Sequence, residues 1–310
     1  MPRLMLLDSA SLYFRAFHGV PDSLTAPDGT PVNAVRGFLD SVAHLLTVHR
    51  PTHLVACWDD DWRPAFRVEA LPSYKAHRVA ADGGEDAPDA LGPQVPVIVD
   101  LLAALGLARV GCPGFEADDV MATLATRAAA RGSDVDVVTG DRDLFQLVED
   151  AGPGRPAVQV LYVGRGVRRL EVVDLAWLRA KYDVDSGQAY ADMAVLRGDP
   201  SDGLPGVAGV GEKTAVGLLR RFGDLAGVQA AAQDPASDLS TGQRQKLLAA
   251  ADYLAAAPLV VRTVREAPVP EVDDAVPTAP ADVDALGALV HRWGVQSSVE
   301  RVLVALASLR

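Results

Sequence analysis

Short runs of aliphatic residues that end in acidic residues recur through the first two thirds of this 310-residue chain. Such runs are typical of strands buried on both faces, as in a parallel sheet. They predict strands at Leu4–Leu7, His53–Trp58, Val135–Thr139 and Val158–Val163. Because parallel strands present their carboxyl ends at one edge of the sheet, the acids that follow them should gather at that edge.

Segments with helical periodicity separate and follow these runs. They predict helices at Val32–Thr47, Pro93–Leu105, Ala117–Ala130, Asp174–Tyr182 and Gly187–Leu196. This alternation is typical of an α/β fold, in which a mostly parallel twisted sheet is flanked by helices. We therefore predict an α/β core over residues 1–197.

The strand pattern stops near residue 198, and short helices separated by Gly and Pro follow. We predict that residues 198–310 form a second, helical region. Its expected helices are Lys213–Phe222 and, after an extended connector at residues 266–281, a final pair at Val283–Arg292 and Ser297–Ser308. Within the core, an acidic stretch rich in Gly and Pro at residues 79–92 is predicted to be mobile.

Nine acidic residues form five clusters at the predicted strand ends and helix starts. They are Asp8, Asp59, Glu116, Asp118, Asp119, Asp141, Asp143, Asp199 and Asp202. Carboxylates brought together in a fold repel one another unless a cation neutralises them. Oxygen ligands favour Mg²⁺ or Mn²⁺. The pattern therefore predicts a centre for two divalent ions, of the kind that hydrolyses phosphodiesters.

Each cluster also has a purely structural explanation. Aspartate commonly caps a turn after a strand, and acids in the first turn of a helix are stabilised by its dipole. The run Asp59-Asp60-Asp61 leaves the candidate ligand open. Asp59 directly follows the apolar run, which favours it over its two neighbours.

The net charge of −12 does not exclude an anionic partner. Without the nine clustered acids, 32 acidic residues remain beside 29 basic ones, so local patches decide what the surface attracts. No apolar stretch approaches the roughly 18 residues of a membrane span, and a cytoplasmic protein is expected. Cys57 and Cys112 are predicted to be buried, and no histidine spacing indicates zinc.

Two further segments could bind phosphate. The basic segment YKAHR at residues 74–78, with Arg63 and Arg67 before it, would attract a phosphate if it lies beside the acids, although a solvated face explains it equally simply. The sequence GVAGVGEKT at residues 206–214 resembles a P-loop, but Glu212 interrupts the pattern. We predict instead a helix–hairpin–helix whose backbone N–H groups bind DNA phosphates, with Lys213, Arg220 and Arg221 nearby.

Together these motifs resemble the 5′-nuclease family, which includes the 5′→3′ exonuclease domain of bacterial DNA polymerase I and the flap endonucleases. The matching stretches are LLDSASLYFRAFH, CWDDDWRPAFR, SYKAHR, GFEADDVMATLA, VVTGDRDLFQLV and LRGDPSDGLPGVAGVGEKTA. The resemblance implies a PIN-like 5′-nuclease fold and cleavage near the 5′ end or at the base of a 5′ flap. The expected partner is flapped, nicked or branched DNA, with an RNA primer strand left open, and the protein is expected to be a monomer.

The resemblance also implies roles for individual residues. It assigns one Mg²⁺ or Mn²⁺ to Asp8, Asp59, Glu116 and Asp118, and a second to Asp119, Asp141 and Asp143 with Asp199 or Asp202. It places Lys75 and Arg78 at the scissile phosphate, beneath an arch at about residues 70–95. It implies DNA contacts from Arg15, Arg67, Tyr74, Gly209, Gly211, Lys213 and Thr214, and a K⁺ site at the hairpin.

The chain departs from the family pattern at two places. A single Asp normally follows the second strand, so an ungapped match to YKAHR would select Asp60 in place of Asp59. Gly203 stands where Asn is usual. Two alternative functions remain. A haloacid-dehalogenase-like phosphatase needs a second Asp two residues after the first, where this chain has Ala10, and a non-catalytic module that grips branched DNA needs no metal site.

Overall fold

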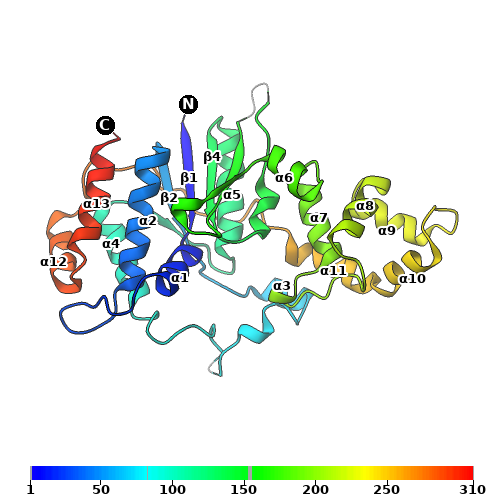
Figure 1. The fold of residues 1–310 in the computed structure, drawn as a ribbon, viewed down its shortest axis with the longest axis horizontal. Helices are drawn as coiled ribbons and strands as arrows, with labels where there is room; N and C mark the ends of the chain where they lie inside the picture. Colours follow the sequence, from blue (N-terminus) through cyan, green and yellow to red (C-terminus); the bar gives the residue numbers. More distant parts are fainter. Residues whose placement is uncertain (1, 82, 153–155, 310) are drawn as a thin grey trace.

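A six-stranded sheet forms the centre of the computed structural model, which describes residues 2–81, 83–152 and 156–309 (Figure 1). The strands are β1 (Arg3–Asp8), β2 (His53–Cys57), β3 (Ala108–Val110), β4 (Asp134–Thr139), β5 (Val158–Tyr162) and β6 (Glu171–Val173). Their order is β3-β2-β1-β4-β5-β6, and every pair is parallel except β5–β6. The four predicted strands and the mostly parallel sheet are confirmed. The three-residue strands β3 and β6 are too short to show a period and were not predicted.

Helices cover both faces of the sheet because side chains alternate along each strand. On β1, Leu4 and Leu6 pack in the core beneath α5 (Ala117–Ala130), whereas Met5 and Leu7 pack in the core beneath α2 (Asn33–His49). The other helices of this part are α1 (Ser9–Gly19), α3 (Ala65–Ala70), α4 (Gln94–Leu105), α6 (Leu175–Tyr182) and α7 (Gly187–Arg197). The five predicted core helices are confirmed to within two residues at each end.

Four short helices extend the molecule beyond α7 (Figure 1). They are α8 (Glu212–Phe222), α9 (Leu225–Gln233), α10 (Thr241–Ala249) and α11 (Ala251–Val261). They share a hydrophobic core with α7 through residues such as Leu218, Val228 and Leu254. The predicted helical region is therefore present directly after the core.

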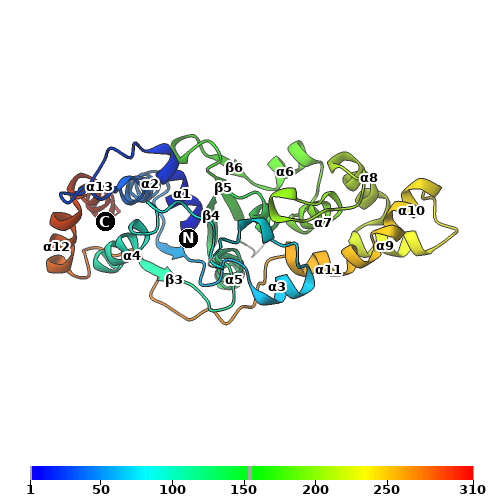
Figure 2. The same cartoon turned by 90° about the horizontal axis from the view of Figure 1, so that it is seen from below.

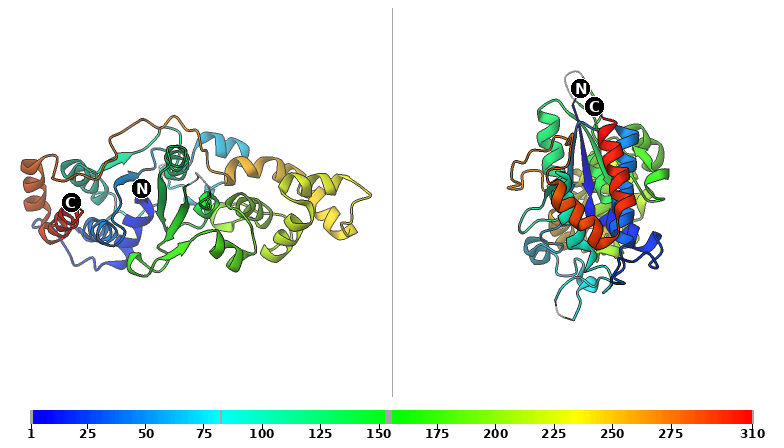
Figure 3. Two further views of the ribbon diagram at one scale, coloured as in Figure 1. Left: turned by 90° about the horizontal axis from the view of Figure 1, so that it is seen from above. Right: turned by 90° about the vertical axis from the view of Figure 1, so that its left-hand side faces the viewer.

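The last two helices do not belong to that region. Residues 263–282 form the predicted extended connector, which runs back along the molecule (Figure 2). The connector is held by backbone bonds such as Leu54 N–H to Asp274 O, 2.8 Å. It leads to α12 (Val283–Trp293) and α13 (Gln296–Ala307), which pack against α2 and α4 at the opposite end (Figure 3). The prediction of one helical region over residues 198–310 is wrong in this respect.

The chain between α3 and α4 crosses the edge of the sheet at which the parallel strands end (Figure 1). It contains the short 3-10 helix η1 (Ala76–Arg78) and a turn closed by the bond from Ala80 N–H to Gly84 O, 2.8 Å. Residue 82, part of the stretch predicted to be mobile, lies outside the described residues. No helix in the described part of the chain is long and apolar enough to span a membrane.

Candidate active site at the carboxyl edge of the sheet

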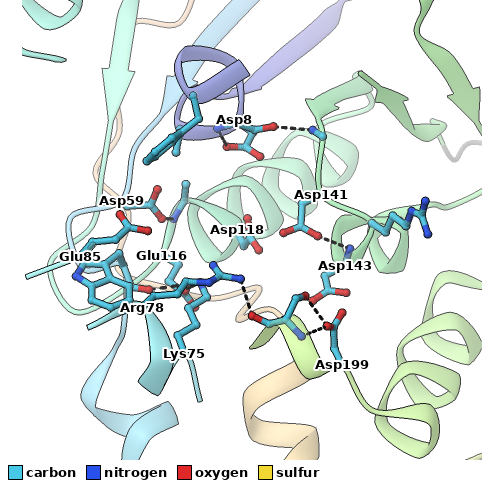
Figure 4. Close-up of a pocket in the computed structure, with 18 of the residues that line it drawn as sticks. Asp8, Asp59, Lys75, Arg78, Glu85, Glu116, Asp118, Asp141, Asp143 and Asp199 are labelled. Carbon is cyan, nitrogen blue, oxygen red and sulfur yellow. Dashed lines mark hydrogen bonds and ion pairs between the residues drawn. The ribbon is translucent and has the colours of Figure 1, made fainter. Parts of the chain in front are cut away.

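A cavity of about 910 Å³ opens at this edge and brings together acids from distant parts of the sequence (Figure 4). Seven of the nine predicted acids line it: Asp8, Asp59, Glu116, Asp118, Asp141, Asp143 and Asp199. They lie at the end of β1, just after β2 and β4, at the start of α5 and just after α7. The parallel sheet therefore converts five separate sequence clusters into one acidic wall.

Asp8 and Asp59 are held by specific hydrogen bonds. Asp8 Oδ1 accepts from the Ser11 N–H (2.9 Å), and Oδ2 accepts from the Thr139 hydroxyl (2.6 Å). Asp59 Oδ1 accepts from the Ala117 N–H at the start of α5, 2.8 Å. Burial raises the pKa of Asp8 to about 6 and that of Asp59 to about 7.

The neighbouring acid Asp60 faces elsewhere. Its carboxylate lies against Gly111, where an added Cβ would meet Asp60 Oδ1 at 2.2 Å. Asp60 is not among the residues that line the cavity. The geometry therefore favours Asp59 over Asp60 as the candidate ligand.

The remaining acids divide into two groups around Asp118. In Figure 4, Asp59 and Glu116 lie on one side of Asp118, and Asp141, Asp143 and Asp199 on the other. Burial, and then the charge of Asp141, raise the pKa of both Asp118 and Asp143 well above the ordinary value. This oxygen-only set, strained by mutual repulsion, has the chemistry that a divalent cation requires. Within the described residues no three of these side chains are already arranged around one ion.

Glu116 is surrounded by donors. The guanidinium of Arg67 and the ammonium of Lys75 both pair with its carboxylate, and the Tyr74 hydroxyl donates to it at 2.9 Å. Although burial lowers the pKa of Lys75, its pairing with Glu116 raises that pKa well above the ordinary value. The Glu116 carboxylate is therefore held at the cavity wall by three donors.

Asp119 has a different position from the other acids. It is fully buried, does not line the cavity, and receives Arg67 Nη2 at 2.7 Å, Arg67 Nη1 at 2.8 Å and the Val264 N–H at 2.8 Å. Helical spacing puts Glu116 and Asp119 on one face of α5, which lets Arg67 pair with both. In this structure Asp119 is therefore an internal ion-pair partner away from the cavity, and its role as a metal ligand stays a prediction.

Two residues predicted to contact DNA take part in the same contacts. The Arg67 side chain is 2% exposed, and Tyr74 is buried with its hydroxyl on Glu116. Neither can reach a phosphate at the surface without breaking these bonds. They support Glu116 from inside the molecule.

Lys75 and Arg78 line the cavity beside the loop that carries Asp199. Arg78 Nη2 donates to Asp202 Oδ1 (2.6 Å) and to the Ser201 carbonyl (2.8 Å). Asp202 is consequently paired and does not line the cavity, whereas Asp199 does. Of the two predicted alternatives, the geometry favours Asp199.

Gly203 explains how closely this loop and the basic segment pack. It adopts a left-handed conformation, with φ of +75°, and a Cβ at this position would lie 2.1 Å from the Ser73 carbonyl oxygen. The Lys75 N–H donates to the adjacent Asp202 carbonyl, 3.0 Å. Gly203 therefore permits the base of the predicted arch to rest directly on the loop.

The predicted hairpin lies between α7 and α8. Gly209 is left-handed, with φ of +71°, and Gly211 is the N-cap of α8, whose first turn exposes Lys213 and Thr214. Arg220 and Arg221 lie in the last turn of that helix and pair with Asp183 and Asp238. The two arginines are therefore not near the hairpin turn, contrary to the sequence prediction.

Sequence reasoning missed Lys246, which supplies a cation at the hairpin. This exposed residue of α10 places its ammonium 2.7 Å from the position of a Cβ on Gly209. No hydrogen bond or ion pair of this ammonium occurs within the described chain. Arg15, a predicted DNA contact, is exposed on α1 and donates to the Gly164 carbonyl at 3.2 Å.

Further residues that line the cavity were also not predicted. They are Phe14, Trp62, Glu85, Arg142, Tyr162 and Arg197. No residue pattern marks them, because each reaches the cavity through the packing of its own loop or helix.

Comparison with known proteins gives the family. The family described as 5′-3′ exonuclease, N-terminal resolvase-like domain, matches residues 3–183, and the 5′-3′ exonuclease C-terminal SAM fold matches residues 186–284. A 5′-3′ exonuclease of Streptomyces coelicolor is 58% identical over 309 residues, covering 98% of this chain and 100% of the relative. A 5′-3′ exonuclease of Mycobacterium tuberculosis is 51% identical over 317 residues, covering 99% and 98%.

A solved structure shares the fold. It is the flap endonuclease of bacteriophage T5 in a pseudo-enzyme–product complex with DNA and metal ions, with a TM-score of 0.65 and 17% identity over 99% of this chain and 98% of that one. The sequence matches extend over both the α/β core and the helical region that carries the hairpin. The chain belongs to the 5′-3′ exonuclease family.

Proposed function

We propose that this 5′-3′ exonuclease hydrolyses DNA phosphodiester bonds near a 5′ end or at the base of a 5′ flap. The observation that carries the proposal is the single cavity lined by seven acids and by Lys75 and Arg78. The printed names of the relatives, and the DNA and metal ions in the T5 complex, support it.

The acids would hold two divalent cations, Mg²⁺ or Mn²⁺. We assign one to Asp8, Asp59, Glu116 and Asp118, and the other to Asp141, Asp143 and Asp199. When bound, such ions lower the pKa of a water and stabilise the charge on the leaving oxygen. The assignment follows the two groups of side chains on either side of Asp118.

Lys75 and Arg78 would bind the scissile phosphate. Both cations line the cavity, and their present partners, Glu116 and Asp202, are carboxylates for which an incoming phosphate can compete. Docking of the basic segment on the Gly203 loop fixes where this phosphate lies relative to the acids. The two side chains thus orient the substrate and offset the charge that develops on it.

The hairpin would bind the duplex beside the cut through its phosphates. Backbone N–H groups at Gly209 and Gly211, with Lys213, Thr214 and Lys246, make a surface that recognises no particular base. Arg15 would contact DNA on the other side of the cavity. Carbonyls of the hairpin would hold K⁺, and the protein would act as a monomer.

A labelled 5′-flapped duplex tests the function. The protein should cleave it in Mg²⁺ or Mn²⁺ and not in excess EDTA, and Asp141→Asn should bind the flap without cutting it. Equal cleavage by Asp141→Asn would contradict the metal assignment. Binding without cleavage by the unmodified protein in either metal would instead support a non-catalytic branched-DNA module.

A further inference from the structure

One aromatic side chain in the cavity has no partner. Phe14, Trp62 and Tyr162 all line the cavity. The Phe14 ring lies 5.3 Å from that of Tyr13, and the Tyr162 ring lies 5.2 Å from that of Phe145. Trp62 is half-buried, and within the described chain its indole makes no ring–ring or cation–π contact.

The backbone that carries Trp62 is held firmly. The side chain of the next residue, Arg63, donates to the carbonyls of Tyr74 (2.6 Å) and Pro72 (3.1 Å). The Trp62 carbonyl itself accepts from Lys75 Nζ, 3.4 Å. The backbone of Trp62 is therefore held against the same segment that carries Lys75, the cation assigned to the scissile phosphate.

The surroundings of this ring indicate its ligand. The cavity is otherwise dominated by charged side chains, so a flat apolar ring at its wall suits a flat, uncharged group attached to something anionic. A nucleotide combines both groups, because each nucleotide carries a flat, uncharged base and an anionic phosphate. Every base has a face that can stack on an aromatic ring, without regard to sequence.

We propose that Trp62 stacks on the unpaired nucleobase next to the phosphate bound by Lys75, and so forms a base subsite in the cavity. The inference rests on the proposed function and adds a subsite to it. Stacking would select substrates whose end base is free to leave the duplex, since a base inside the duplex is stacked between its neighbours and both of its faces are covered. The indole would hold that base while Lys75 and Arg78 hold the phosphate.

Flap substrates with an abasic nucleotide on either side of the scissile phosphate test the proposal. Trp62→Ala should raise KM about 5- to 100-fold on the normal flap, while Trp62→Phe should retain most of the affinity. The abasic nucleotide should raise the KM of the unmodified protein by a similar factor and should leave the KM of Trp62→Ala almost unchanged. Trp293→Ala, a change at a half-buried tryptophan of α12, is the matched control and should behave as the unmodified protein.

Two outcomes would overturn the base subsite: an unchanged KM in Trp62→Ala, or an abasic penalty that persists in that variant. Failure of the unmodified protein to cleave any flap would count against the proposed function instead. If Trp62→Ala does not fold, tryptophan fluorescence decides the question. Adding flap DNA in EDTA should quench the unmodified protein more than Trp62→Phe, and equal quenching would contradict stacking.

Discussion

Asp59 and Asp60 are adjacent in the sequence, but only Asp59 lines the cavity. Asp59 follows β2 and turns into the cavity, where the Ala117 N–H holds it. Asp60 turns toward Gly111. The sequence left the choice open, because both acids follow the same apolar run. Which of the two faces the cavity depends on the course of the backbone after β2, and the residue types there do not indicate that course.

This pair gives a matched prediction for the active site. Asp59→Asn should reduce cleavage of a 5′ flap by about 100-fold or more, because an amide is a poorer ligand for a hard cation than a carboxylate. Asp60→Asn should stay within about twofold of the unmodified enzyme. Single-turnover rates in Mg²⁺ measure both, and a larger loss in Asp60→Asn would transfer the assignment to that residue.

At the scale of elements, Arg67 joins three helices. It lies on α3, pairs with Glu116 and Asp119 at the start of α5, and donates through Nε to the Val260 carbonyl of α11, 3.1 Å. The start of α5 is thus connected to the helical region that carries the hairpin. Removing the guanidinium would leave the buried Asp119 without its counter-ion and Glu116 with Lys75 alone.

Arg67→Met should therefore lower the free energy of unfolding by about 3–5 kcal/mol. Arg165→Met is the control, because that side chain is 80% exposed and its one ion pair within the described residues spans 4.0 Å. It should change stability by about 0.5 kcal/mol or less. Urea unfolding measures both, and equal effects would contradict the internal role of Arg67.

The hairpin gives a second prediction at this scale. Lys213→Ala and Lys246→Ala should each weaken binding to a nicked duplex and each reduce the salt slope of log K by about one. Arg220→Ala removes the same charge from α8, but its guanidinium is paired with Asp183 far from the turn, so the slope should not change. Titrations in EDTA over a range of NaCl concentrations provide the slopes. If Arg220→Ala reduced the salt slope as much as Lys246→Ala does, the proposed contact of Lys246 with the duplex would be contradicted.

For the whole molecule, the crowded acids make stability depend on pH. The ordinary pKa of an aspartate carboxyl is 3.8, and burial raises the pKa of Asp8 to about 6 and that of Asp59 to about 7 in the folded protein. At pH values between the ordinary pKa of 3.8 and the raised pKa values of about 6 and about 7, the folded state binds more protons than the unfolded state. Unfolding free energy therefore falls as pH rises through this window.

In EDTA the melting temperature should be several degrees higher at pH 5.5 than at pH 7.5. Mg²⁺ or Mn²⁺ should stabilise the protein more at pH 7.5, because a cation binds the deprotonated acids. Asp59→Asn should show a weaker pH dependence, since one of the titrating groups is gone. Differential scanning calorimetry measures these melting temperatures. A melting temperature in EDTA that rises from pH 5.5 to pH 7.5 would contradict the predicted direction.

Local sequence pattern was sufficient for the strands, the long helices and most of the acids. Aliphatic runs bury on both faces of a parallel sheet, so Asp8, Asp141 and the acids after β2 had to emerge at one edge. Motif spacing also indicated the hairpin, because its glycines define a turn and the first turn of α8 follows directly. These features depend on neighbours in the chain.

Tertiary packing alone decided which charged residues face the cavity. Arg67, Asp119 and Asp202 carry the same local signals as their neighbours, yet each is paired inside the protein with a partner from another element. Lys246 reaches Gly209 from a separate helix, and the connector runs along the molecule so that α12 packs on α4 and α13 on α2. Contacts between residues so distant in sequence depend on how whole elements fit together, and no short stretch of sequence records that fit.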